Sequence, residues 1–390
     1  MLKGVFFIVS FCFCLLISAQ QPIPPRNSFV LETQFHAGVI LRNSGDVPKN
    51  SMPFMAEINP SFQTNGREDW HQIFRFPRVG CGIIFGSLGN RRELGSILGF
   101  VPNITFKSTD DKWFTPSYNF GLGIAYFNKP YNEQTNPTNF YIGSHITALG
   151  QVSVQIEPKL SNKLNLIAGV KIVHCSNSHY QVPNLGINVL SFSMGLKFNN
   201  QTQTQERIYR ELETPPSKLK LNARTGVGVH EFARTFGPAG TPKYSIYITD
   251  VYLSKRYGKV SNIHAGVELK YYNSFYNFIV TNDFLPGNAK MQSTVITAFM
   301  AHELMIKRVG FVTQVGYNLY NKFYKEYIKM WKSEQGLNSE LKKHISTRLG
   351  VQYYFFDPKY CTQRNVFIGA YIKANLGMAD FACMQLGVVF

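Results

Sequence analysis

Alternation of apolar and polar residues limits what this chain can fold into more than any other feature of its sequence. From residue 29 onward, segments of about 10–16 residues alternate in this way, and breaks rich in Gly, Asn and Pro separate them. Side chains of a β-strand point to its two faces in turn, so the pattern predicts strands with one apolar face. The expected strands cover residues 29–42, 53–63, 71–87, 94–107, 114–127, 140–158, 163–176, 185–199, 219–234, 243–257, 260–274, 292–306, 309–322, 345–357, 365–377 and 379–390.

Segment length separates a membrane barrel from a secreted β-sandwich. A tilted strand needs ~9–11 residues to cross a bilayer, and these segments are long enough. The last strand alternates from Ala382 up to the terminal Phe390, which resembles the assembly signal of bacterial outer-membrane barrels. The prediction is therefore an all-β, antiparallel transmembrane β-barrel of the cell outer membrane, placed there by the barrel-assembly machinery. The sandwich is the alternative.

The sequence also predicts two related halves of about eight strands each. Residues 20–199 and 219–390 are the expected halves, and residues 200–218 form a polar, Pro-containing linker. The halves end in similar phrases, FSMGLKF at 192–198 and MQLGVVF at 384–390. Alternation alone leaves open whether about sixteen strands make one large barrel or two eight-stranded barrels.

The N-terminus predicts export. Lys3 precedes an apolar run from Val5 to Ile17, and small residues follow up to Ala19, a pattern typical of a signal peptide over residues 1–19. A membrane anchor is the less favoured alternative, since a span needs ~20 apolar residues. The net charge of +17 is strongly basic. Export and the lack of a nucleic-acid-binding motif exclude nucleic acid as the expected partner and favour an anionic lipid surface.

One polar cluster interrupts the apolar faces of two neighbouring predicted strands. Its members are His174, Ser176, Asn177, Asn184 and Asn188. His174 and Ser176 lie two residues apart on one strand, so they point the same way and can share a hydrogen bond. The predicted roles are a His174 base, a Ser176 nucleophile for an ester carbonyl, and Asn188 orienting the imidazole. The amides of Asn177 and Asn184, together with backbone N–H groups of the loop between the strands, are the expected oxyanion donors.

Strand counting places this cluster at a membrane surface. In an even-stranded outer-membrane barrel both termini are periplasmic, so the seventh strand runs outward. His174 and Ser176 then lie at its outer end on the lipid-facing side. A polar pair on a lipid-facing surface is unfavourable unless it has a function there.

The phrase HCSNSHYQVPNLGIN at 174–188 resembles the signature of the PagL-type lipid A deacylases, the acyloxyacyl hydrolase-like family. Residues 70–95 and 136–146 resemble the longer branch of that family. The resemblance covers about 29–199 well and the second half loosely. It implies an outer-membrane barrel that cleaves an ester-linked acyl chain from lipid A, the membrane-embedded part of lipopolysaccharide.

The resemblance also implies roles for individual residues. His174 matches the general base and Ser176 the nucleophile, while Asn177 and Asn184 match the asparagines of the motif. The third catalytic position is an acid in the well-studied members and is Asn188 here. A non-catalytic barrel derived from the family, acting as a pore or a scaffold, is the alternative function.

No metal or cofactor is predicted. The four cysteines of the expected mature chain lie far apart and lack the spacing of a zinc site. The His-Glu pairs at 230–231 and 302–303 lack the second His of a metalloprotease motif, so they are expected to line a pore or an interface. A basic stretch at 323–344 is expected to form a helical loop, which either is solvated or contacts lipid phosphates.

Overall fold

The structure is a computed structural model. It describes residues 28–42, 48–108, 116–199, 207–212, 214–233, 240–330, 341, 343–360, 364–375 and 378–390. The expected signal peptide at 1–19 lies outside the described residues, as do residues 200–206 and 213 of the expected linker.

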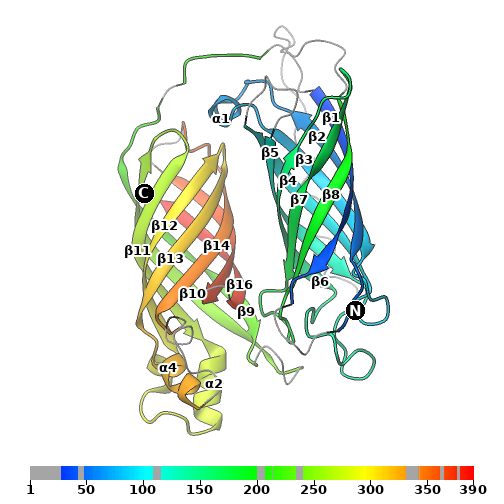
Figure 1. Ribbon diagram of the computed structural model, residues 1–390. Helices are drawn as coiled ribbons and strands as arrows, with labels where there is room; N and C mark the ends of the chain where they lie inside the picture. Colours follow the sequence, from blue (N-terminus) through cyan, green and yellow to red (C-terminus); the bar gives the residue numbers. More distant parts are fainter. Residues whose placement is uncertain are drawn as a thin grey trace, which may run out of the picture.

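The strands form two closed antiparallel barrels of eight strands each, which stand side by side in Figure 1. The first barrel contains β1 (Ser28–Ile40), β2 (Phe54–Gln63), β3 (Arg78–Ser87), β4 (Ser96–Lys107), β5 (Pro116–Phe127), β6 (Ile146–Ile156), β7 (Leu164–Ser176) and β8 (Ile187–Asn199). The second contains β9 (Leu219–Glu231), β10 (Lys243–Tyr257), β11 (Ser261–Tyr272), β12 (Thr294–Ile306), β13 (Val309–Tyr320), β14 (Ile345–Tyr354), β15 (Asn365–Asn375) and β16 (Met378–Val389). The predicted barrel with two related halves is confirmed, and the closed sheets exclude the sandwich. Of the two arrangements left open, the chain adopts two eight-stranded barrels.

Among the described residues, short helices in the connections include α1 (Asp69–Ile73), α2 (Asn273–Thr281), α3 (Ala289–Gln292) and α4 (Lys322–Lys329). Two expected strand starts were wrong. The strand expected from 71 begins at Arg78 because α1 occupies its start, and the strand expected from 140 begins at Ile146. The expected helical loop at 323–344 is helical where it begins, in α4. Among the described residues, no helix is both long enough and apolar enough to cross a membrane.

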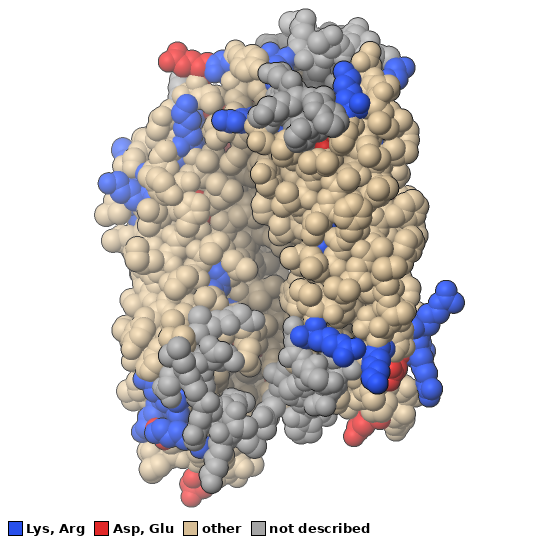
Figure 2. All heavy atoms as spheres, in the orientation of Figure 1, with Lys and Arg blue, Asp and Glu red and all other residues tan. Residues whose placement is uncertain are grey.

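The outer walls of the barrels are apolar. On β7, Val170 and Ile172 point outward and are 49% and 44% exposed, while Lys171 and Val173 between them face the interior and are buried. Figure 2 shows the charged side chains mainly toward the two ends of the molecule, with a band of other residues between them. An apolar band flanked by charged ends suits a wall that contacts lipid.

Ion pairs fill the interiors. In the first barrel, Arg78 donates to both carboxylate oxygens of Glu157, at 3.0 and 2.6 Å, and lies 2.6 Å from Glu32. In the second, Arg348 pairs with Asp250 at 3.2 Å. Both arginines are only 1% exposed. Charged side chains that lined a water-filled channel would be accessible to solvent, so these interiors are packed rather than open.

The barrels touch each other at both ends. We call the end at which β7 and β9 finish the site end, and the other the opposite end. At the opposite end, Asp69 of α1 lies 2.5 Å from Arg210 and 2.5 Å from Lys359, which belongs to the β14–β15 connection. At the site end, the β7–β8 loop, residues 177–186, contacts the end of β9 and the start of β10.

Candidate active site

The pairing of β7 with β8 brings His174 and Asn188 together. The two residues are direct partners in the ladder and both point to the outer face. His174 Nδ1 lies 2.7 Å from Asn188 Oδ1. An amide oxygen only accepts hydrogen bonds, so Nδ1 carries the proton and donates it. The lone pair is therefore on Nε2, which is the tautomer that a general base requires.

The hydroxyl of Ser176 accepts two hydrogen bonds from the β7–β8 loop. Its Oγ accepts from Asn184 Nδ2 at 2.9 Å and from the backbone N–H of Ser178 at 3.3 Å. A hydroxyl has two acceptor lone pairs and one proton, so Ser176 keeps its proton free to donate. Within the described part of the chain, no hydrogen bond joins His174 to Ser176. Such catalytic hydrogen bonds commonly tighten only when substrate binds.

Gly186 lies next to both the His174 imidazole and the Ser176 side chain. A Cβ at this position would lie 3.1 Å from His174 Cε1 and 3.5 Å from Ser176 Cβ. The backbone of Gly186 has φ +71°, which favours glycine. Gly186 therefore packs against both predicted catalytic side chains. Any larger residue at this position would come into close contact with the His174 imidazole.

Asn177 contributes to the loop rather than to the hydroxyl. Its side-chain amide donates to Ser144 Oγ at 3.0 Å and to Gln181 O at 2.7 Å, and its backbone N–H donates to Asn184 Oδ1 at 3.3 Å. The structure therefore brings His174 to Asn188 and Asn184 to Ser176. It does not bring the side-chain amide of Asn177 to Ser176.

Sequence reasoning missed two contributions, those of Gly186 and Ser144, and it expected backbone N–H donors in the loop without saying which residue supplies them. Gly186 lies inside the quoted motif, and a glycine beside two polar site residues was a usable signal. Ser144 comes from the β5–β6 loop. It lies within residues 136–146, which resemble the family, but no role was predicted for its side chain. The Ser178 contribution is a backbone N–H, which depends on the left-handed conformation of that residue, φ 54°, and not on its side chain.

Burial keeps the loop's own histidine neutral. Burial lowers the pKa of His179 below its ordinary value, while its Nε2 donates to Ala233 O at 3.1 Å. A neutral ring suits this hydrogen bond, because Nε2 carries a proton in one neutral tautomer. His179 thus serves the contact with the second barrel and has no place beside Ser176 Oγ.

A polar hollow opens beside the loop at the site end. Asn128, Lys129, Asn132, Asn136, Ser144 and Gln181 are among the residues that line it. Two of them, Ser144 and Gln181, are the partners of the Asn177 amide. The hollow therefore borders the candidate site directly.

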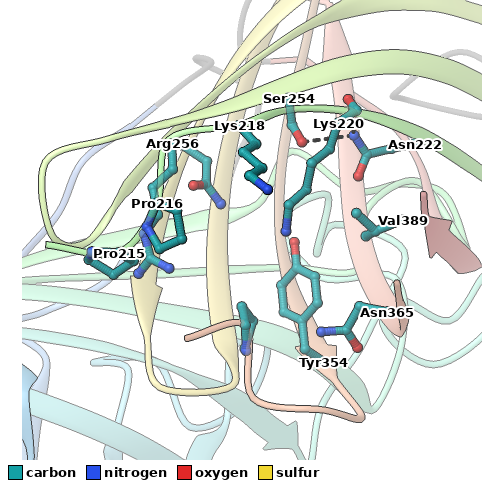
Figure 3. A pocket seen from close by; sticks show the side chains of 12 residues that line it. Pro215, Pro216, Lys218, Lys220, Asn222, Ser254, Arg256, Tyr354, Asn365 and Val389 are labelled. Atoms are coloured by element: carbon teal, nitrogen blue, oxygen red, sulfur yellow. Dashed lines mark hydrogen bonds between the residues drawn. The ribbon is translucent and has the colours of Figure 1, made fainter. Parts of the chain in front are cut away.

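A second hollow lies at the opposite end of the second barrel, shown in Figure 3. Lys218, Lys220 and Arg256 line it together with Tyr354, and Asn222 donates to Ser254 Oγ at 2.8 Å across one wall. None of the described residues that line it is a histidine, so they offer no serine–histidine pair.

The two His-Glu pairs make protein contacts. His230 Nε2 lies 2.8 Å from Ser274 Oγ inside the second barrel, and His302 Nε2 lies 3.2 Å from Ser261 Oγ. Glu303 is fully buried and accepts from the Tyr354 hydroxyl at 2.9 Å. Among the described residues, no group of three or more His, Cys, Asp or Glu side chains is placed to hold a metal ion.

The fold is that of an outer-membrane β-barrel protein, and the site at its rim combines a serine with a histidine in the tautomer of a base. Residues 55–197 match the protein-family model for Lipid A 3-O-deacylase (PagL), and residues 219–390 match the model for Acyloxyacyl hydrolase, C-terminal domain. Together the two models span about four fifths of the 390 residues. The chain belongs to this family: its first barrel matches the PagL model and its second barrel matches the model for the acyloxyacyl hydrolase C-terminal domain.

Two of the solved structures that match part of the chain are the outer-membrane enzyme PagL and Neisserial surface protein A. The outer-membrane enzyme PagL matches at 19% identity, over 44% of this chain and 98% of its own, with a TM-score of 0.28. Neisserial surface protein A matches at 11% identity, over 44% of this chain and 96% of its own, with a TM-score of 0.30. No curated protein sequence matches this chain. The family places the chain in the outer membrane as a β-barrel.

Loop lengths orient the barrels in that membrane. Outer-membrane barrels have short periplasmic turns and longer extracellular loops. In the second barrel, the turns at 258–260 and 307–308 lie at the opposite end, whereas the connections that contain α2 to α4 lie at the site end. Loop length therefore predicts that the site end faces the cell exterior, with His174 and Ser176 at the outer rim of the lipid-facing wall.

Proposed function

We propose that this protein is an outer-membrane esterase that hydrolyses an ester-linked acyl chain of lipid A, with Ser176 as nucleophile and His174 as general base. One observation carries the proposal. The hydrogen bond from His174 Nδ1 to Asn188 leaves a lone pair on Nε2, and Ser176 accepts two N–H groups and keeps its proton. A proton donor and a matching acceptor thus face the same side of one strand.

The positions of the protons on His174 and Ser176 define a reaction in two steps. Ser176 Oγ attacks the carbonyl carbon of the acyl ester while its proton passes to His174 Nε2. As Oγ bonds to carbon, Asn184 Nδ2 and the Ser178 N–H shift their hydrogen bonds from Oγ to the carbonyl oxygen and stabilise the negative charge that develops there. When the tetrahedral intermediate collapses, the bond between the carbonyl carbon and the sugar oxygen breaks. The sugar oxygen takes the proton from His174 Nε2. Water then gives a proton to His174 Nε2 and attacks the acyl-serine carbonyl; the bond to Oγ breaks, the proton passes from Nε2 to Ser176 Oγ, and the fatty acid is released.

The surroundings of Ser176 suit an amphipathic ester. Val170 and Ile172, below it on the same outward face of β7, are exposed and apolar, as a surface for an acyl chain requires. Asparagines and Lys129 line the neighbouring hollow, and amide and ammonium groups suit a phosphorylated sugar. An ester that joins an acyl chain to such a headgroup would lie between the two, at the level of the serine.

The packed interiors argue against the alternative of a pore. Arg78 and Glu157 in the first barrel, and Arg348 and Glu268 in the second, are each no more than 2% exposed. Mass spectrometry of lipid A from cells that express the protein tests the enzyme against the pore. The expected result is a species lighter by one acyl chain than in cells with an empty vector. Unchanged lipid A, together with ion conductance in planar bilayers, would refute the esterase.

Replacing Asn188 tests how the base is oriented. Asn188→Ala removes the acceptor of the Nδ1 proton, so kcat is expected to fall by about 10- to 100-fold through loss of orientation. Asn188→Asp keeps the acceptor and adds a charge that stabilises the imidazolium, so kcat is expected to rise by up to about 10-fold. The acidic limb of the pH–rate profile should move to higher pH in the aspartate variant. Wild-type kinetics in the alanine variant would contradict this role.

Gly186→Ala tests the space between imidazole and hydroxyl. The new Cβ meets His174 Cε1 at 3.1 Å, so the ring must shift and kcat is expected to fall by about 10- to 100-fold. Gly258→Ala is the matched control, because Gly258 also has positive φ, +61°, but a Cβ added there would meet no atom within 4 Å. Fatty acid release should be normal in the control. Equal losses in both variants would show that backbone strain, rather than the ring, is responsible.

A further inference from the structure

A carboxylate on the outward side of the second barrel reaches the loop of the candidate site. Glu231 is the last residue of β9, on which His230 faces the interior, so Glu231 faces away from the interior of its own barrel. It is nevertheless only 1% exposed. A carboxylate on the outer wall of a membrane barrel is unfavourable unless it is paired. The hydrogen-bond partners of Glu231 therefore indicate its role.

Both oxygens of Glu231 accept hydrogen bonds. Oε1 accepts from Thr241, at 2.7 Å from the backbone N–H and at 3.0 Å from the hydroxyl. Oε2 accepts from the backbone N–H of Val182, at 2.8 Å. The N–H of Glu231 donates to His179 O at 3.0 Å. Thr241 belongs to the second barrel, whereas Val182 and His179 belong to the loop that carries the site of the first.

Two further contacts join the same segments. His179 Nε2 donates to Ala233 O at 3.1 Å, and the ammonium of Lys243 lies 4.4 Å from the centre of the Tyr180 ring. The second barrel therefore holds the loop from residue 179 to residue 182.

The first barrel holds the other end of the loop. The backbone N–H groups of Leu185 and Gly186 donate to Phe140 O and Tyr141 O, both at 3.0 Å. Asn184 lies between the two anchored segments. Its side chain bridges Ser176 Oγ and the backbone N–H of Asn177. The position of this amide is consequently fixed from both barrels.

We propose that the second barrel is a positioning unit for the site on the first barrel, and that Glu231 is the positioning residue through which it acts. The proposal rests on the proposed esterase function. Glu231 touches neither the ester nor the reacting atoms. It holds the main chain at Val182, two residues before Asn184, and so sets the distance from the Asn184 amide to Ser176 and to the charge that develops beside it.

Kinetics of the purified full-length protein on lipid A in detergent test this role. Glu231→Ala is expected to lower kcat by about 10- to 100-fold and to leave KM within about twofold, since the amide acts on charge formed during reaction. Glu231→Gln keeps one acceptor oxygen and should recover part of the rate. Asp69→Ala is the matched control, because it removes contacts between the barrels at the opposite end. It should leave kcat unchanged.

A double-mutant cycle separates positioning from a general loss of structure. If Glu231 acts through Asn184, the variant with both Glu231→Ala and Asn184→Ala should be no slower than Asn184→Ala alone. Additive losses, or a wild-type kcat in Glu231→Ala, would overturn the proposal. The failure of the proposed function has a different signature: activity would persist in Ser176→Ala. An inactive Ser176→Ala beside a fully active Glu231→Ala would refute only the positioning role.

Discussion

Ser176→Ala is expected to slow the release of fatty acid from lipid A by at least about 1,000-fold. The substitution removes the oxygen that forms the acyl-enzyme, and no other group in the site replaces it. The Asn184 amide and the Ser178 N–H remain in place, so binding of lipid A should change far less than turnover. Release of fatty acid from purified lipid A in detergent, followed by mass spectrometry, measures both kcat and KM.

A fluorophosphonate gives an independent readout for the same variant. The reagent should form an adduct on the peptide that contains Ser176 in the wild type and none on that peptide in Ser176→Ala. Ser193→Ala is the matched control, since the Ser193 hydroxyl is buried inside the first barrel and has no hydrogen-bond partner among the described residues. It should retain wild-type activity and labelling. Persistent deacylation by folded Ser176→Ala would rule out this nucleophile.

His174→Ala is expected to lower kcat by about 100- to 10,000-fold, the range that a general base typically contributes. Without the Nε2 lone pair, the Ser176 proton has no acceptor in the site. His174 is exposed on the outer face, so added imidazole can reach the vacated space and should restore part of the rate. The expected observation is a rate that rises with imidazole concentration in the variant and stays constant in the wild type.

The control for this variant is another histidine on a strand. His302→Ala removes a half-buried ring of β12 that contacts Ser261 in the second barrel, far from β7 in the fold. Its activity should be normal and independent of imidazole. If His174→Ala kept the wild-type rate, or if its fluorophosphonate labelling at Ser176 were as fast as in the wild type, His174 would not be the base.

Much of the fold followed from local pattern. The period-of-two alternation places Val170, Ile172 and His174 on one face of β7, and the structure has all three pointing outward. That face depends only on the geometry of a single strand, which is why the sequence predicts it. The two wrong strand starts, at 71 and 140, lie where aromatic residues in connections imitate strand composition.

The alternation of apolar and polar residues could not predict whether the chain forms one barrel or two. Closure of the first barrel requires β8 to pair with β1, as Val189 does with Ile40 and Asn199 with Val30, rather than with β9. Both choices satisfy the same apolar faces and the same backbone hydrogen bonds. The difference lies in pairing between segments some 160 residues apart, which alternation does not encode.

The sequence by itself determined the barrel class and the alignment of His174 with Ser176 on one outward face, since both follow from strand periodicity. The predicted roles of these residues came from their chemistry and from the family motif. Only the tertiary structure decided what surrounds the serine. Asn184 reaches Ser176 from 8 residues away through a folded loop, and Glu231 reaches Val182 from 49 residues away in the other barrel. Such contacts depend on how loops and barrels pack, and that packing is settled by the whole chain.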